Sequence, residues 1–377
     1  MKHKTGILCS CFTMMSYLAI SPVMAEIAEE FSDVDISTVQ MILTLPSLVC
    51  LTTSLLAGVL ARRIYKRTII LLSAGCYMAG GLCPLLVNSS IVPLLICSAV
   101  MGLGIGGMVT SSAALICDCY EGRERSQMMG FQSAVIGLGG TAFTLLGGWL
   151  SRFGWRAAYG AFFLLIPCFF IVLLYLPKGA LDTPEESAGE RRIPGYVWGM
   201  ALIGFLFFVL QHTFNTNISF YMAETGLGTA RTASLATSLY TFAGLLAGCL
   251  LPLLMKRLKQ YTVPLSFLLG AAGLLLAWLG GSLAVILLGA VFIGFGFAMF
   301  TPASSCLVAE HVDGAGYSAC LALTSACNNL GGALSPVIVN PLSGWFGPSV
   351  RMKFLTAAAA LLIVTAAAGV WLRPKLK

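Results

Sequence analysis

Three glycines near residue 100 have the spacing of a nucleotide-binding loop. Gly102, Gly104 and Gly107 form a G-x-G-x-x-G pattern, in which a tight glycine turn brings a dinucleotide's pyrophosphate to a helix N-terminus. That chemistry needs a strand before the glycines and a helix after them. Here the glycines lie inside a 26-residue run, residues 92–117, without Asp, Glu, Lys, Arg or His. Such a run predicts a helix crossing the roughly 30 Å hydrocarbon core of a bilayer, so nucleotide binding is not expected.

Polar side chains inside apolar runs are the other residues that could do chemistry. Such side chains are costly in hydrocarbon, so near the middle of a span they should face protein or a water-filled cavity. There they could bind a ligand, or they could only join two helices by a hydrogen bond, and the sequence leaves both open. The candidates for substrate binding are Tyr17, His212, Asn215, Tyr240, Asn328 and Asn329.

Aromatic residues accompany this polar set, namely Phe205, Phe292, Phe295 and Phe300. Rings with a few amides fit a flat or amphipathic organic molecule better than an ion, although an aromatic stripe can also be packing. No apolar run has a Lys or Arg near its centre. A small anion would ordinarily need such a countercharge or a helix N-terminus directed at it. Nitrate, phosphate and cyanate are therefore disfavoured as ligands.

Two titratable side chains lie within or beside the expected cavity. No Asp or Glu lies at the middle of a run, which leaves Glu26 and His212 as candidates for proton coupling. Glu26 could instead belong to an acidic external segment that also contains Glu29 and Glu30. Protons are thus one candidate for a coupled ion.

Membrane-spanning helices must position these residues. Of the 377 residues, 58% are hydrophobic and 10% are charged, and the mean hydropathy is +0.90, whereas about 25% of residues are charged in a soluble domain. The apolar runs predict an all-α polytopic membrane protein with twelve transmembrane helices. The expected spans are residues 6–26, 36–60, 68–87, 92–117, 126–150, 157–176, 196–221, 230–254, 263–280, 283–308, 317–342 and 352–371.

Basic residues are distributed unevenly between the loops. With the N-terminus inside, 17 of the 22 Lys and Arg residues fall in segments expected on the cytoplasmic side. The positive-inside rule therefore places both termini in the cytoplasm. The net charge of +7 follows this asymmetry, so no nucleic acid partner is expected. The first run resembles a cleavable secretory signal, but the later spans need a first helix, and we expect it to be retained.

The chain contains an internal repeat. At an offset of 192 residues, 13 of the 56 positions from Val100 to Trp155 are identical. This predicts two parallel six-helix bundles related by an axis along the membrane normal. The expected domains are residues 1–180 and 195–377, joined by a cytoplasmic linker at residues 181–194 that has the polar, charged composition of a flexible segment.

The repeat gives the glycines near residue 100 another explanation. Gly102 and Gly106 lie four residues apart on one face of the expected helix, where a neighbouring backbone can approach closely. The second copy keeps Gly294 and Gly296 but has Ala298 in place of the third glycine. A phosphate loop would not be duplicated and then lose a glycine, so we expect helix packing in both copies.

Between the second and third spans the chain resembles the major facilitator superfamily. The family signature Gly-x-Leu-Ala-Asp-Arg-x-Gly-Arg-Lys corresponds to residues 58–67, GVLARRIYKR, with Arg62 in place of the Asp and Tyr65 in place of the second Gly. In the family, the Asp helps to lock the inner gate by charge pairing. Here Arg63 could pair with Asp118 as a gating contact instead, or it could serve only as a positive-inside anchor.

The fifth span resembles the antiporter pattern Gly-x8-Gly-x3-Gly-Pro-x2-Gly-Gly. Gly130, Gly139, Gly147 and Gly148 are in register, while residues 143–144, Phe-Thr, replace the Gly-Pro. The resemblance implies kinship with the drug-efflux, proton-antiporter branch, and it implies that Gly139 and Gly147 are helix-packing positions. Ser98 stands where the family often has an arginine linked to proton coupling.

The resemblance implies that the two parallel six-helix repeats surround a central cavity. It also implies a secondary transporter that moves a small, neutral or amphipathic organic molecule by alternating access, with export expected rather than import. A uniporter or importer, and a receptor or assembly component that has lost transport, remain alternatives. We expect a monomer in the cell's inner or plasma membrane, with a small-molecule substrate and the lipid bilayer as its partners. No nucleophile–base pair is evident, and the thirteen cysteines contain no Cys-x-x-Cys. An enzyme, a metal site and a cofactor are therefore not expected.

Overall fold

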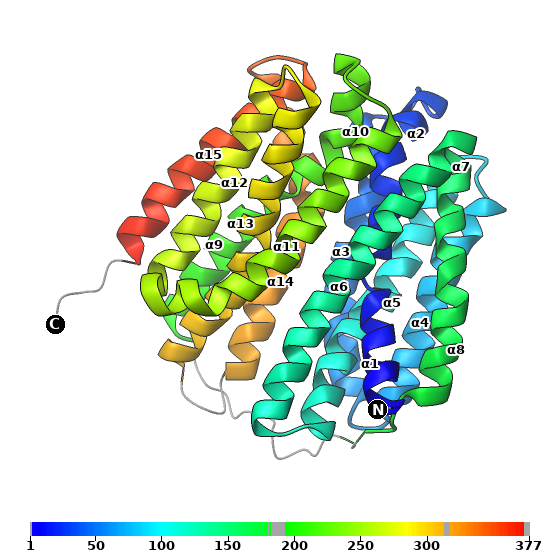
Figure 1. The fold of residues 1–377 in the computed structure, drawn as a ribbon, viewed down its shortest axis with the longest axis vertical. Coiled ribbons are helices and arrows are strands. Elements are labelled where there is room, and N and C mark those ends of the chain that lie inside the picture. The colour runs from blue at the N-terminus through cyan, green and yellow to red at the C-terminus, as the bar shows by residue number, and fades with distance from the viewer. Residues whose placement is uncertain (1, 180, 182–192, 313–316, 373–377) are drawn as a thin grey trace. The chain divides into compact units, whose positions relative to one another are not determined.

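The computed structural model describes residues 2–179, 181, 193–312 and 317–372, and all regular structure in these residues is helical (Figure 1). Residues 182–192 of the expected linker lie outside the described residues. Among the described residues, ten helices are long and apolar enough to cross a membrane. The chain is thus an all-α polytopic membrane protein.

Each of the twelve expected spans coincides with one helix or with consecutive short helices. Expected spans 230–254 and 317–342, which are not among those ten, are helices α11 and α14. In the first half the helices are α1 (Lys2–Phe12), η1 (Ser16–Val23), α2 (Met24–Glu30), α3 (Ile36–Leu60), α4 (Lys66–Leu82), η2 (Cys83–Leu85), α5 (Ile91–Cys119), α6 (Gly122–Leu150), η3 (Ser151–Phe153), α7 (Trp155–Ala158), η4 (Tyr159–Leu164) and α8 (Leu165–Tyr175).

The second half continues in the same way. Its helices are α9 (Gly195–Gln211), α10 (Thr213–Thr225), α11 (Ala230–Leu258), η6 (Lys259–Tyr261), α12 (Thr262–Leu279), α13 (Leu283–His311), α14 (Tyr317–Gly344) and α15 (Val350–Trp371).

Contacts within the chain define two compact units. Unit 1 comprises Met1–Pro184 together with Ile218–Ser238, and unit 2 comprises Glu185–Asn217 together with Leu239–Lys377. The end of α10 and the start of α11 therefore pack in unit 1, although they follow the expected linker in the sequence. The six-helix domains 1–180 and 195–377 stay a prediction.

The internal repeat is visible in how glycines pack. In unit 1, a Cβ added at Gly104 would lie 2.5 Å from the carbonyl oxygen of Ser73. In unit 2, a Cβ at Gly296 would meet the carbonyl oxygen of Ser266. The two glycines are 192 residues apart, and the carbonyl groups that they face are 193 residues apart. Both units therefore bring two helix backbones together through a glycine that packs against a carbonyl group.

The position where the two copies differ shows a compensating exchange. In unit 1, a Cβ at Gly106 would lie 2.6 Å from the carbonyl oxygen of Cys50 in α3. In unit 2, Ala298 replaces that glycine, and the residue opposite it on α11 is Gly244, where a Cβ would lie 3.2 Å from the Ala298 Cβ. The helix that carries the glycine has changed, but the close approach has been kept.

The first span is interrupted, whereas the sequence predicted one continuous helix. Helix α1 ends at Phe12, residues 13–15 form a turn, and a 3-10 helix, η1, follows (Figure 1). Three hydroxyls each donate to the carbonyl oxygen three residues earlier: Ser10 to Ile7 at 2.7 Å, Thr13 to Ser10 at 2.8 Å, and Ser16 to Thr13 at 2.9 Å. Such bonds compete with the i→i−4 amide ladder and bend helices. Pro22, inside η1, has no N–H group and therefore cannot donate to the i→i−4 ladder.

Candidate functional site

Four rings of unit 2 form an aromatic cluster around Phe297. The ring centroid of Phe297, on α13, lies 5.2 Å from Phe208, 5.8 Å from His212 and 5.6 Å from Tyr240. His212 also stacks on Phe208, at 5.6 Å and 26°. We call Phe208, His212, Tyr240 and Phe297 the aromatic cluster. It joins α9, α11 and α13, and it unites two predicted binding residues, His212 and Tyr240.

His212 occupies the junction between α9 and α10, where its main chain ends the first helix. The backbone of α14 covers the imidazole, since a Cβ at Gly332 would lie 3.1 Å from its Cε1. The Nδ1 atom is buried and has no hydrogen-bond partner among the described residues. Buried polar atoms are normally paired, so this nitrogen is an exception among the buried side chains.

The two predicted asparagines of α14 differ in burial. Asn328 is 6% exposed, and its Oδ1 has no hydrogen-bond partner among the described residues. Its amide lies against Gly204 of α9, where no side chain intervenes. Asn329 is half-buried, and Asn215 of α10 is buried. Asn328 therefore offers a second buried acceptor on the α9–α14 contact.

None of the phenylalanines named from the sequence belongs to the aromatic cluster. Phe300 is fully buried and stacks on Phe207 at 4.3 Å, so it belongs to the core of unit 2. Phe208 and Phe297 were missed. A helical period could have found Phe208, because it precedes His212 by four residues and therefore shares its face. Nothing in the sequence distinguishes Phe297 from its neighbouring phenylalanines.

In unit 1, the predicted residues Tyr17 and Glu26 lie on either side of the junction between η1 and α2. Tyr17 is a half-buried residue of η1, and its N–H donates to the hydroxyl of Tyr77 at 2.9 Å. Glu26 is half-buried in the first turn of α2. Both side chains therefore belong to the interrupted first span.

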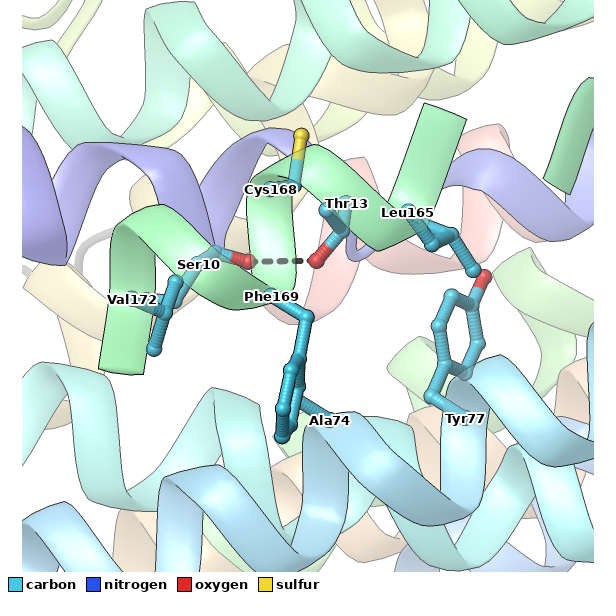
Figure 2. A pocket seen from close by; sticks show the side chains of 8 residues that line it. All are labelled: Ser10, Thr13, Ala74, Tyr77, Leu165, Cys168, Phe169 and Val172. Atoms are coloured by element: carbon cyan, nitrogen blue, oxygen red, sulfur yellow. Dashed lines mark hydrogen bonds between the residues drawn. The ribbon is translucent and has the colours of Figure 1, made fainter. Parts of the chain in front are cut away.

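A small cavity beside the interruption is too small for an organic substrate. It lies between α1, α4 and α8, and Ser10, Thr13 and Tyr77 contribute its polar lining (Figure 2). Its volume is about 10 Å³, which is about the space needed by one water molecule. The figure also shows the Thr13 hydroxyl directed at the carbonyl oxygen of Ser10.

The four glycines predicted to pack helices all face backbone carbonyls in unit 1. A Cβ at Gly102 would lie 2.7 Å from the oxygen of Pro46, and a Cβ at Gly106 would face Cys50 as described above. On α6, Gly139 faces the carbonyl oxygen of Phe12, and Gly147 faces that of Ala19. Side chains at these positions would separate the helices. Their role in transport stays a prediction.

The ion pair at Asp118 corrects an expectation from the sequence. Asp118 pairs with Lys66, whose Nζ lies 2.9 Å and 2.8 Å from its two carboxylate oxygens, and not with Arg63. The Lys66 side chain is only 2% exposed. Lys66 opens α4 on the face that continues with buried Ile69 and Ile70, which directs it toward α5, whereas Arg63 lies exposed in the preceding turn. The gating role of Asp118 stays a prediction.

Comparisons with known proteins bear on the family and the fold. The family model of the Major Facilitator Superfamily matches residues 6–230 and 200–377. No curated protein sequence matches the chain significantly.

Solved transporter structures share the fold. A nucleoside transporter superposes with a TM-score of 0.78 at 11% identity, covering 99% of this chain and 100% of that one. A POT family transporter in complex with 5-aminolevulinic acid gives 0.77 at 14% identity, covering 97% and 95%. A D-xylose–proton symporter gives 0.72 at 18% identity, covering 96% and 95%. These neighbours are transporters and not enzymes, and at such identities they support the fold alone. Because the family model covers nearly the whole chain, the chain belongs to the major facilitator superfamily.

Proposed function

We propose that this transporter moves a small, neutral or amphipathic organic molecule that carries a ring and binds at the aromatic cluster. The observation that carries the proposal is the buried Nδ1 of His212, which lies between the rings of Phe208 and Phe297 and has no hydrogen-bond partner within the described part of the chain. None of the four side chains of the cluster carries a fixed charge. Offset or edge contacts with a ligand ring would supply affinity, and the imidazole nitrogen would orient the ligand.

We also propose that transport proceeds outward and is coupled to protons. The antiporter-like glycine spacing on α6, Gly130 to Gly148, supports export. Glu26 and His212 are the proposed proton carriers, because both titrate in an accessible range when unperturbed. One structural relative, the D-xylose symporter, is proton-coupled by its name.

Flux in proteoliposomes tests the proposal. With a panel of neutral aromatic compounds, we expect His212→Ala and Phe297→Ala to raise the KM of the transported compound about tenfold, because each removes one ring contact and the first also removes a hydrogen bond. Phe346→Ala is the matched control, since Phe346 is 69% exposed at the end of α14 in unit 2. Binding without flux in the parent protein would favour the receptor alternative, and unchanged KM in both variants would reject the aromatic cluster.

The same vesicles test proton coupling. We expect Glu26→Gln or His212→Gln to abolish accumulation driven by an imposed pH gradient while substrate exchange continues, because exchange needs no net proton movement. Undiminished gradient-driven flux in the double variant would exclude both residues. If flux through the parent protein does not depend on the imposed pH gradient, the protein is a uniporter or is coupled to another ion.

We further propose that both termini are cytoplasmic, on the evidence of the uneven distribution of basic residues. Two exposed loop positions at opposite ends of α5, Ser89 and Glu121, make this testable. In intact cells, a membrane-impermeant maleimide should label Ser89→Cys above the parent background and should label Glu121→Cys only after permeabilisation. The opposite pattern would reverse the topology.

A further inference from the structure

The 3-10 segment η1 is held at each end by a hydroxyl from another helix. A 3-10 helix has poorer hydrogen-bond geometry than an α-helix, and runs longer than three or four residues are uncommon. η1 has eight residues and still persists as a buried part of unit 1. Its persistence calls for partners outside the segment.

Tyr77 of α4 supplies the partner at the first end. Tyr77 is 1% exposed, its Oη lies 2.8 Å from the Ser16 Oγ, and the same Oη accepts a hydrogen bond from the Tyr17 N–H at 2.9 Å. The neighbouring amides of Ser16 and Leu18 donate to carbonyls three residues earlier. Tyr77 therefore provides the hydrogen-bond acceptor for the Tyr17 amide, next to the turn between α1 and η1.

Ser219 supplies the partner at the second end. Its hydroxyl donates to the carbonyl oxygen of Pro22 at 2.6 Å and accepts from the N–H of Ala25 at 3.1 Å. Ala25 is the second residue of α2, and the first four N–H groups of a helix lack partners within it. Ser219 is 5% exposed and lies on the part of α10 that belongs to unit 1. One hydroxyl thus joins the last turn of η1 to the first turn of α2.

Helix α6 approaches the same segment along its side. Gly147 faces the carbonyl oxygen of Ala19 within η1, and Gly139 faces that of Phe12 just before the turn. Tyr77, Ser219 and these glycines come from three different helices, so the surroundings of η1 hold it in addition to its own hydrogen bonds.

We propose that Tyr77 and Ser219 are positioning residues that keep η1 in its 3-10 form and thereby set the orientation of Glu26 relative to Tyr17. A 3-10 helix turns about 120° and rises about 2.0 Å per residue, against about 100° and 1.5 Å for an α-helix. Over the six residue steps from Tyr17 to Val23, conversion to α-helix would rotate Glu26 by about 120° relative to Tyr17 and bring the two residues about 3 Å closer along the axis. The consequence for transport rests on the proposed roles of Tyr17 and Glu26.

Hydrogen exchange of the purified full-length protein in lipid nanodiscs tests the proposal without any substrate. In Tyr77→Phe, the Tyr17 amide should exchange about tenfold faster, because its acceptor is gone. Tyr159→Phe is the matched control, since Tyr159 is a buried tyrosine of the same unit whose hydroxyl has no partner among the described residues. Peptides of α12, in unit 2, should not change in either variant.

A serine series tests the second end independently. Ser219→Ala should accelerate exchange at Ala25 by about tenfold, and Ser219→Thr should restore protection because it keeps the hydroxyl. Ser111→Ala is the control, as Ser111 is buried in unit 1 and its hydroxyl has no partner among the described residues. Unchanged exchange at both ends, or equal acceleration in the controls, would overturn the proposal. If Tyr77→Phe does not fold, the serine series alone decides. Because no ligand is used, a failure here is separate from a failure of the aromatic cluster.

Discussion

Gly139→Leu is expected to prevent the transporter from reaching its native fold. Gly139 of α6 faces the carbonyl oxygen of Phe12, so even a Cβ would overlap the backbone of α1. A leucine would force the two helices apart along a contact that continues to Gly147, and overpacking alone costs about 1–3 kcal/mol when only side chains must move. Here a backbone group must move, so we expect a loss of about 3 kcal/mol or more.

Gly130 provides the matched control for this substitution. It lies on the same helix, and a Cβ there would have no other atom within 4 Å. Gly130→Leu should therefore leave thermal stability unchanged or slightly raised, since leucine has the higher helix propensity. The measurement is the yield of monodisperse protein and its unfolding temperature in detergent. Equal stability of the two variants would show that α1 and α6 do not need their close approach.

Breaking the Lys66–Asp118 pair is expected to destabilise unit 1, by about 3–5 kcal/mol where the buried Lys66 ammonium loses its carboxylate and by less where Asp118, whose side chain is 18% exposed, loses the ammonium. The effect should be clearest in Asp118→Leu, which leaves the 2% exposed ammonium of Lys66 without its carboxylate. The double variant Lys66→Met with Asp118→Leu should recover most of the loss, since a buried ion pair and an apolar pair of similar volume often have similar stability.

Arg63→Met is the control for the ion pair, because Arg63 is exposed in the turn before α4. Its effect should stay within about 0.5 kcal/mol, as for other surface substitutions. Unfolding temperatures of the four variants give the comparison. A double variant less stable than both single variants would mean that each residue makes important contacts outside the pair.

The sequence predicted the helices well because each is a long apolar run separated from the next by polar or charged residues. It predicted the first span less well: the break follows from serine and threonine hydroxyls that act on their own backbone, and its stability depends on Tyr77 and Ser219, which are distant in the sequence. The same limit applies to Asp118. Charge pattern alone could not choose between Arg63 and Lys66, because the choice depends on which residue begins the buried face of α4.

The candidate site was only partly predictable for a related reason. His212 and Tyr240 could be named because polar groups are rare in apolar spans, but an aromatic partner carries no such signal among many phenylalanines. Phe297 is central to the aromatic cluster only because α13 turns it toward α9 and α11. Helix rotation of this kind is set by tertiary packing.

The exchange of a glycine between Gly106 and Gly244 affects how the ancestry of the two halves should be measured. Aligned position by position, Gly106 against Ala298 counts as a difference, and Gly244 enters the alignment elsewhere. What both halves keep is the close contact between two helices. The contact requires a glycine on one of the two helices, and either helix can carry it. Residue identity therefore understates the kinship of the halves, and a comparison of facing pairs would recover part of what divergence has hidden.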